Sequence, residues 1–325
     1  MTLIVSRVTP TLGIVGLRLQ PLNPREGQFI MRIFVTGATG FLGSAIAHEL
    51  IDTGHQVLGL TRSEDGARSL AAIGVEVHRG DIEDLDSLRR GAGMADGIVH
   101  TAFNHDFSRF AANCEADQQA VEAMGTALLG SERPLIVTSV CMLGISAPGK
   151  PATEDYMNPD HPNPRNASEL SAIALAQRGV NVSMVRLPQV HNPVRQGLIT
   201  SMIELAREKS VSAYVGDGLN RWAAVHLSDA VRVYALALEK NVTGSRYHAV
   251  AEEGISLRTI AEAIGRGLNV PVKSVAAEDA PAHFDWLSPF VGRDMSASSA
   301  LTQERLAWQP KGPELIADLE AMSYE

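Results

Sequence analysis

The stretch from Met31 to Gly43, MRIFVTGATGFLG, joins an apolar run to three regularly spaced glycines. The run over 31–36 is apolar and contains β-branched residues, which predicts a short buried strand. Gly37, Gly40 and Gly43 then lead into a helical pattern. Glycines in such a turn let backbone amides approach a pyrophosphate, and the helix N-terminus adds unpaired N–H groups and partial positive charge. We therefore predict a dinucleotide site here, although any tight strand-to-helix turn also favours glycine.

Beyond this turn, predicted strands and helices alternate. Strands are expected at 31–36, 56–60, 75–78, 97–101 and 134–139, separated by helices at 42–51, 64–73, 84–90 and 107–130. This order with short connections demands a parallel sheet covered on both faces, so we predict an α/β, doubly wound Rossmann fold. Residues 31–190 would form its nucleotide-binding domain.

The C-terminal part departs from strict alternation. Helices are expected near 195–208, 228–239 and 256–268, and strands near 211–215 and 247–250. We expect residues 191–325 to form a smaller substrate lobe that is interleaved with the last Rossmann elements.

Composition and charge argue against several classes of function. The chain has 325 residues, 45% of them hydrophobic, and a formal net charge of −9. It offers no basic face for nucleic acid or for an anionic membrane. Its two cysteines, Cys114 and Cys141, have neither metal-ligand spacing nor a disulfide framework. We therefore expect no metal site and a cytoplasmic location.

The first thirty residues differ from the rest. Prolines and arginines interrupt their apolar residues, so no run reaches the ~18 residues of a membrane span. Charges inside the apolar part also argue against a secretory signal. We interpret residues 1–30 as a dispensable N-terminal extension.

The end of the second predicted strand indicates which dinucleotide binds. An acidic residue there would bond the ribose hydroxyls, whereas a basic residue accommodates a 2′-phosphate. The sequence has Arg62 and no carboxylate at this position, which predicts NADP. Asp81 and Ile82, after the third predicted strand, are expected at the adenine edge, and the alternative for Asp81 is a helix N-cap.

Seven stretches together resemble the short-chain dehydrogenase/reductase superfamily, in its extended or atypical, NAD(P)-dependent epimerase/dehydratase-like branch. They are TGATGFLG at 36–43, GDIED at 80–84, HTAF at 100–103, VTSV at 137–140, RLPQVHNP at 186–193, RWAAVHLSDAVRVYALALE at 221–239 and LAWQP at 306–310. The resemblance implies cofactor contacts from the glycine turn, from the end of the fourth strand and from the segment after the sixth. Those residues are Gly37, Thr39, Gly40, Phe41, Leu42, Gly43, Thr101, Ala102, Phe103, Pro188 and Val190.

The resemblance fails at the residues that usually carry the chemistry. Relatives use a Tyr-x-x-x-Lys pair on the helix after the fifth strand, and here Arg165 and Glu169 stand at those two positions. Their spacing puts both on one helix face, so an intrahelical ion pair is the simplest interpretation. Asp117 stands about where many relatives have an asparagine, and it is either a structural polar residue or part of a different proton route.

Other side chains could replace the missing pair. Ser139 occupies the place of the substrate-orienting serine, and its alternative is a hydroxyl bonded to a nearby carbonyl. Arg165 could supply charge beside a developing alkoxide, and His191, next to the nicotinamide-packing segment, could supply charge or a proton. We therefore name Ser139, Arg165 and His191 as candidate catalytic residues.

These residues predict an NADP-dependent oxidoreductase of the carbonyl reductase or alcohol dehydrogenase type, acting on a small ketone or aldehyde. A sugar-nucleotide epimerase or dehydratase is one alternative, although such reactions depend on the missing tyrosine and lysine. A non-catalytic, NADP-binding regulatory protein is another. Many superfamily members dimerise through the helices after the fourth and fifth strands, so a homodimer is an option.

Overall fold

The glycine turn connects a buried strand to a helix, as predicted. The computed structural model describes residues 30–324, so the extension expected at 1–30 lies outside the described residues except for Ile30. Strand β1 (Arg32–Thr36) ends at Gly37, and α1 (Phe41–Asp52) begins one residue after Gly40. Gly37 has φ +70°, a left-handed conformation that an L side chain rarely adopts, so the turn requires glycine there.

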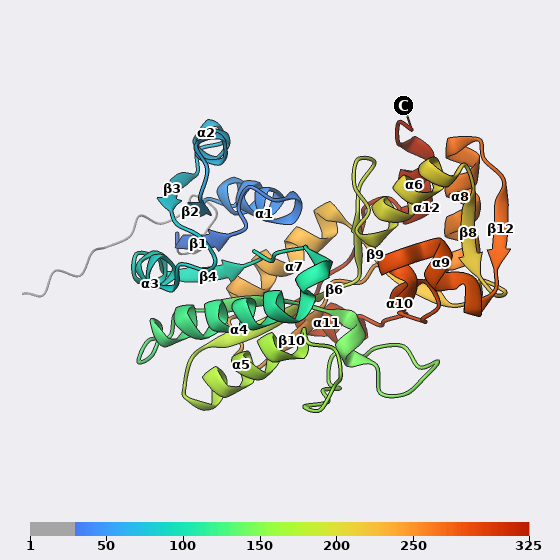
Figure 1. Ribbon diagram of the computed structural model, residues 1–325. Coiled ribbons are helices and arrows are strands. Elements are labelled where there is room, and N and C mark those ends of the chain that lie inside the picture. Colours follow the sequence, from blue (N-terminus) through green and yellow to red (C-terminus); the bar gives the residue numbers. More distant parts are fainter. Residues whose placement is uncertain (1–29, 325) are drawn as a thin grey trace, which may run out of the picture. The chain divides into compact units, whose positions relative to one another are not determined.

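Seven parallel strands form the main sheet, in the order β3-β2-β1-β4-β5-β6-β10 (Figure 1). Sequence order reverses on either side of the β1–β4 pair, the switch point at which ligands of such sheets bind. The predicted doubly wound fold is therefore confirmed. Besides β1, the strands are β2 (Gln56–Thr61), β3 (Glu76–Arg79), β4 (Gly97–His100), β5 (Leu135–Val140), β6 (Val182–Leu187) and β10 (Arg246–His248).

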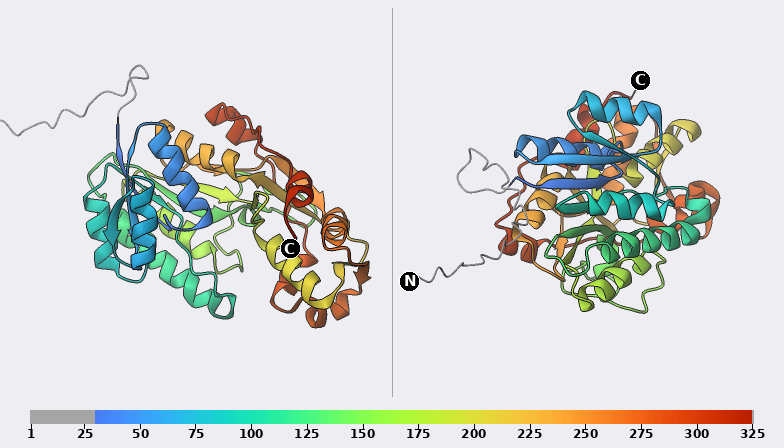
Figure 2. Two further views of the ribbon diagram at one scale, coloured as in Figure 1. Left: turned by 90° about the horizontal axis from the view of Figure 1, so that it is seen from above. Right: turned by 90° about the vertical axis from the view of Figure 1, so that its left-hand side faces the viewer.

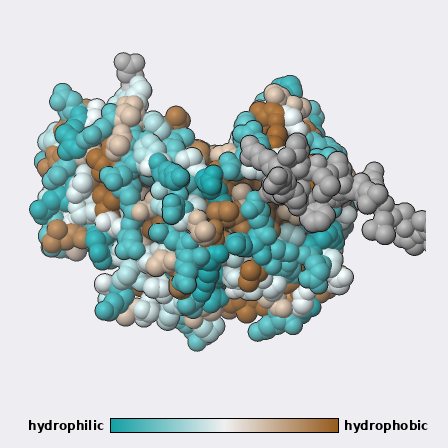
Figure 3. All heavy atoms as spheres, turned by 180° about the vertical axis from the view of Figure 1, so that it is seen from behind, coloured by the Kyte–Doolittle hydropathy of each residue, from teal (hydrophilic) through white to brown (hydrophobic). Residues whose placement is uncertain are grey.

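Helices cover both faces of this sheet, as Figure 2 shows. Alternate residues of one strand reach opposite cores, since Ile33 packs in the core beneath α1 and α7 whereas Phe34 packs beneath α3, α4 and α5. On the far side of the molecule from Figure 1, apolar side chains are scattered among hydrophilic ones (Figure 3). The helices are α2 (Glu64–Ala72), α3 (Leu85–Gly93), α4 (Phe110–Thr126), α5 (Asn166–Gln177) and α7 (Leu227–Lys240).

The C-terminal residues add two smaller sheets and a third core. Strands β8 (Ser212–Val215) and β12 (Val272–Val275) pair in parallel, and β9 (Arg221–His226) lies between β7 (Gln189–His191) and β11 (Glu252–Ser256). This core contains Trp222 and Phe284. The remaining helices and helical turns of the described residues are α6 (Leu198–Lys209), α8 (Leu257–Leu268), α9 (Ala280–Phe284), η4 (Asp285–Leu287), α10 (Ser288–Val291), α11 (Ala300–Leu306), α12 (Leu315–Ala321), η1 (Phe107–Arg109), η2 (Cys141–Gly144) and η3 (Ala277–Asp279).

Element types agree with the sequence-based expectation, and some boundaries differ. The helix expected over 107–130 is divided, because Asp106 caps the short 3-10 turn η1 before α4 begins at Phe110. The helix expected from residue 195 begins at Leu198, after Gly197 with φ +58°. Among the described residues, no helix is both long enough and apolar enough to cross a membrane.

Helix α3 offers a matched test of the packing against β1. A Cβ atom at Gly91 would overlap the Phe34 ring, whereas a Cβ at Gly93 in the same helix meets nothing within 4 Å. We expect Gly91→Ala to lower the free energy of unfolding by about 1–3 kcal/mol, because overpacking outweighs the gain in helix propensity. Gly93→Ala should be neutral or stabilising by up to about 1 kcal/mol. Urea unfolding of both variants measures this, and equal effects would contradict the packing.

Candidate active site

The glycine turn has the geometry of a pyrophosphate cradle. A Cβ atom at Gly43 would overlap the carbonyl of Gly37, and one at Gly37 would lie 2.8 Å from the amide nitrogen of Ala102. Gly40 is the N-cap of α1 and provides no side-chain acceptor for the first amides of that helix. Those amides and the N-terminal end of the helix dipole therefore suit an anionic group. The residues present fit a dinucleotide.

The end of β4 is attached to the end of β1 beside this cradle. Thr101 Oγ1 donates to the carbonyl of Thr36 at 2.7 Å, and the amides of Thr101 and Ala102 donate to Thr36 Oγ1 at 3.2 and 3.3 Å. The predicted cofactor contacts Thr101 and Ala102 thus lie next to the glycine turn, and Phe103 follows them in the chain. Thr39, Phe41 and Leu42 lie in the turn and the first turn of α1, and Pro188 and Val190 follow β6.

A buried histidine continues the connection from Thr36 to α4. His100 Nδ1 lies 2.7 Å from Thr36 Oγ1, and His100 Nε2 lies 3.0 Å from Asp117 Oδ1. Since Thr36 Oγ1 already accepts from two amides, its own proton is best donated to Nδ1. This leaves the Nε2–H of a neutral imidazole to donate to Asp117, a tautomer that is assigned from its partners.

Arg165 pairs with Asp117, and this overturns the expected ion pair with Glu169. Its Nη1 donates to Asp117 Oδ2 and, at 2.8 Å, to Ser168 Oγ, while Nη2 donates to the carbonyl of Thr138 at 2.9 Å. Burial alone would raise the pKa of Asp117, but Arg165 and then His100 hold it well below its usual range. The i, i+4 spacing permitted a local pair, but the packing of α4 against α5 supplied a buried partner instead.

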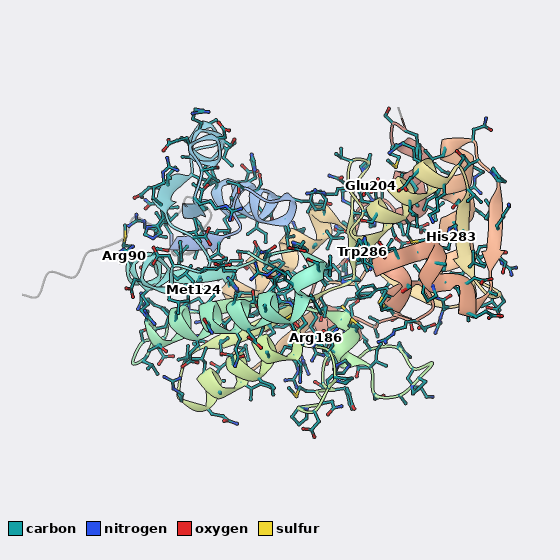
Figure 4. The ribbon with its side chains drawn as sticks, in the orientation of Figure 1. Arg90, Met124, Arg186, Glu204, His283 and Trp286 are labelled. Carbon is teal, nitrogen blue, oxygen red and sulfur yellow. The ribbon has the colours of Figure 1, made fainter. Side chains whose placement is uncertain are left out.

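Glu169 has its own buried partner on β6. Arg186, which Figure 4 labels, donates through Nε to Glu169 Oε1 at 2.8 Å and through Nη2 to Oε2 at 2.7 Å. Neither side chain is exposed. Ser139 Oγ donates to Glu169 Oε1 at 2.5 Å. The expected alternative, a bond to a nearby carbonyl, is therefore wrong in detail, because the acceptor is a carboxylate from α5. In this arrangement the Ser139 proton is not free for a substrate oxygen.

Arg165 retains hydrogen-bonding capacity beyond these contacts. Its guanidinium carbon lies 4.3 Å from the centroid of the Phe103 ring, a cation–π geometry. The guanidinium is a planar fork of N–H donors, and the contacts of the described residues leave its Nε–H and one Nη2–H without a partner. A cation with two unused donors thus lies beside the predicted cofactor contact Phe103.

His191, the third candidate, lies in a separate buried cluster. Its Nδ1 is 2.7 Å from Asp318 Oδ2 on α12, its Nε2 is 3.7 Å from Glu252 Oε2, and its ring lies 5.7 Å from that of His226. Burial lowers the pKa of His191 and raises that of Glu252. The described contacts bring Ser139 and Arg165 together around Thr138 and α5, and they do not include His191.

The predicted 2′-phosphate residue is exposed and weakly paired. Arg62 Nη1 lies 3.3 Å from Asp81 Oδ2, and the Arg62 side chain is 82% exposed. The N-cap alternative for Asp81 is wrong, because Asp84 caps α3 by accepting from the Ser87 amide. Asp81 accepts from the amide of Glu83 instead, next to Ile82.

Sequence reasoning missed two members of the buried network. Arg186 and His100 had no role assigned, yet each holds a carboxylate of the candidate site. The available signal was a charged or titratable residue inside an otherwise apolar strand, as in VSMVRL and GIVH. Such a residue needs a buried partner.

Comparisons with known proteins identify the family of this chain. A family model described as "NAD dependent epimerase/dehydratase family" matches residues 33–251. An uncharacterized protein of Schizosaccharomyces pombe is 47% identical over 90% of this chain and its own full length. A 2-alkyl-3-oxoalkanoate reductase of Stenotrophomonas maltophilia is 27% identical over 66% of this chain and 67% of its own.

A solved structure extends the agreement to the whole fold. The dTDP-glucose 4,6-dehydratase DesIV of Streptomyces venezuelae, solved with NAD bound, superposes with a TM-score of 0.73 at 21% identity. The match covers 90% of this chain and 95% of the dehydratase. The fold and the glycine turn define a nicotinamide-dinucleotide-binding oxidoreductase of the extended short-chain dehydrogenase/reductase type. The chain belongs to the NAD dependent epimerase/dehydratase family.

The buried Glu169–Arg186 pair gives a stability prediction. Arg186→Met should lower the free energy of unfolding by about 3–5 kcal/mol, because it leaves a buried carboxylate without its cation. The double variant Glu169→Leu/Arg186→Met should recover much of that loss. As a control, Arg178→Met removes a half-exposed pair with Glu122 and should cost less than about 1 kcal/mol. Denaturant unfolding compares them, and a double variant as unstable as the single one would contradict the pairing.

Proposed function

We propose that this chain is an NADP-dependent carbonyl reductase in which Arg165 binds the substrate oxygen. The observation that carries the proposal is the guanidinium of Arg165, which is held by Asp117, Ser168 and Thr138 and has two N–H donors that the described contacts leave unused. It lies at the carboxyl edge of the sheet, next to Phe103, where folds of this type bind their ligands.

The residues around Arg165 suit stabilisation of a negative oxygen. In the proposed reaction a hydride adds to the carbonyl carbon, a proton from water adds to the oxygen, and the reduced cofactor is oxidised. The nicotinamide supplies that hydride when it is bound. Arg165 donates hydrogen bonds to the oxygen as negative charge develops, in a site that is already rigid before the substrate arrives. Since arginine keeps its proton, Arg165 acts as an electrostatic donor and not as the acid.

The other two candidate residues have different positions in this proposal. Ser139 lies at the same strand end, but its proton goes to Glu169, so Arg165 takes the donor role first assigned to the serine. We propose that Ser139 contacts the substrate through its oxygen. The catalytic role of His191 stays a prediction, which its contacts with Asp318 do not support.

One of the relatives supports carbonyl chemistry. The Stenotrophomonas maltophilia protein is named as a reductase of a 3-oxo acid, a ketone substrate. The choice of NADP rests on Arg62, whose exposed guanidinium follows a strand that ends in Thr61 and not in a carboxylate.

Substitution of Arg165 tests the reductase proposal. Arg165→Met should reduce kcat/KM for activated ketones by about 10²-fold or more, the cost of an oxyanion donor, while NADPH affinity stays within a few-fold. Arg165→Lys should keep part of the activity because it retains the charge. Oxidation of NADPH, followed by absorbance, measures turnover, and Arg178→Met is the control.

Several results would contradict the proposal. Full turnover by Arg165→Met would show that Arg165 has no role in the mechanism. Tight NADPH binding without reduction of any carbonyl would favour a regulatory protein. Epimer formation from a sugar nucleotide without net cofactor consumption would favour an epimerase.

The cofactor proposal has its own matched pair of variants. Arg62→Ala should weaken NADPH binding by about 1–3 kcal/mol, the size of a charge-assisted hydrogen bond, and leave NADH binding unchanged. Arg68→Ala removes an exposed arginine that pairs with Asp65 on α2, and it should affect neither cofactor. Titration by nicotinamide fluorescence measures both, and equal losses for NADPH and NADH would exclude contact with the 2′-phosphate.

A further inference from the structure

Five aromatic side chains from two distant parts of the chain form a continuous wall next to Arg165. Phe103 and Phe107 come from the connection between β4 and α4, and Phe110 is the first residue of α4. Trp286 and Phe290 come from η4 and α10. We call these five residues the aromatic wall. Figure 4 labels Trp286 between the start of α4 and the C-terminal helices.

Ring contacts join the wall from end to end. Phe107 stacks on Trp286 with centroids 4.7 Å apart and ring planes 15° apart, and it contacts Phe290 edge-on at 6.4 Å. Phe110 lies 5.6 Å from Phe107 and 6.2 Å from Phe103. Phe103 in turn lies beneath the Arg165 guanidinium. The wall therefore begins at the proposed oxygen-binding cation and ends at an exposed tryptophan.

The wall remains partly accessible to a ligand. Trp286 is 39% exposed, and the four phenylalanines are half-buried. The nucleotide side and the C-terminal side contribute facing rings that contact each other and bury only part of their area. A planar apolar group placed against these rings would cover aromatic surface that water now reaches.

The segment that carries Trp286 and Phe290 has few charged residues. Residues 280–291 contain no lysine or arginine, and their one carboxylate, Asp285, is next to Trp286. His105 packs edge-on against Phe103 at 5.3 Å, and desolvation followed by the charge of Arg165 lowers its pKa. Arg165 is thus the one cation in direct ring contact with the wall among the described residues.

We infer that the substrates of this chain are aromatic or conjugated planar ketones and aldehydes, whose ring lies on the aromatic wall while the carbonyl oxygen faces Arg165. Trp286 and Phe107 determine this specificity. The inference rests on the proposed carbonyl reduction, but the binding of an aromatic ligand can be measured without turnover.

The three tryptophans provide a direct binding assay. Trp222 and Trp308 are 0% and 1% exposed, so acrylamide quenching of the intrinsic fluorescence reports mainly on Trp286. With NADPH present, 1-phenylethanol cannot react and should protect the quenchable fluorescence, and UDP-glucose should not. Loss of the quenchable fraction in Trp286→Ala confirms the reporter. Protection by UDP-glucose but not by 1-phenylethanol would overturn the inference.

Kinetic measurements distinguish a role of the aromatic wall in substrate binding from a role in the reduction itself. Trp286→Ala should lower kcat/KM for acetophenone about tenfold and leave that for 2-butanone nearly unchanged, whereas Trp286→Phe should retain most of the preference. Leu129→Ala, an equally exposed apolar residue just beyond α4, is the control. Equal effects of Trp286→Ala on both ketones would overturn the inference and leave the reductase proposal intact. Protection by 1-phenylethanol without turnover of any ketone would support the binding of aromatic ligands at the wall and would contradict the reductase proposal.

Discussion

The buried ion pair between Asp117 and Arg165 is the interaction on which the arrangement of the site depends. It joins α4 to the start of α5, and the second amino group of Arg165 reaches the backbone at the end of β5. His100 extends the same hydrogen-bonded chain to Thr36, one residue before the glycine turn. The cradle for the cofactor and the cation proposed for the substrate are consequently parts of one rigid unit, so the geometry between them is set before any ligand binds.

A second buried ion pair keeps the buried charges of this site balanced. Arg165 and Glu169 lie one helical turn apart, yet each pairs outward, with Asp117 on α4 and with Arg186 on β6. The two cations and two carboxylates balance within the interior, where an unpaired charge would be strongly destabilising. Arg165 and Glu169 therefore form a charge network with two other elements, and neither can change alone without leaving a buried partner unpaired.

In this proposal, catalysis and substrate choice belong to different parts of the fold. The family model matches residues 33–251, which contain the cradle, the network and Arg165, whereas Trp286 and Phe290 lie beyond its end. The chemistry common to the family would thus reside in the sheet, and the choice of substrate in rings contributed by the C-terminal part. This agrees with the general rule that rigid strand ends position reactive groups while loops and added elements vary in specificity.

The sequence by itself determined the Rossmann fold, the glycine turn and the sites of most strands and helices, because hydrophobic periodicity and glycine spacing are local properties of the chain. It also identified Arg165 as a candidate site residue. It could not determine the partners, since Asp117 and Arg186 are distant in sequence from Arg165 and Glu169 and the i, i+4 spacing offered a local pair. The contacts of His191 with Asp318, and of Phe107 with Trp286, likewise come from the packing of segments far apart in the chain. Only the tertiary structure decided these contacts, because a buried charge or ring takes the partner that packing brings within reach, whatever its sequence separation.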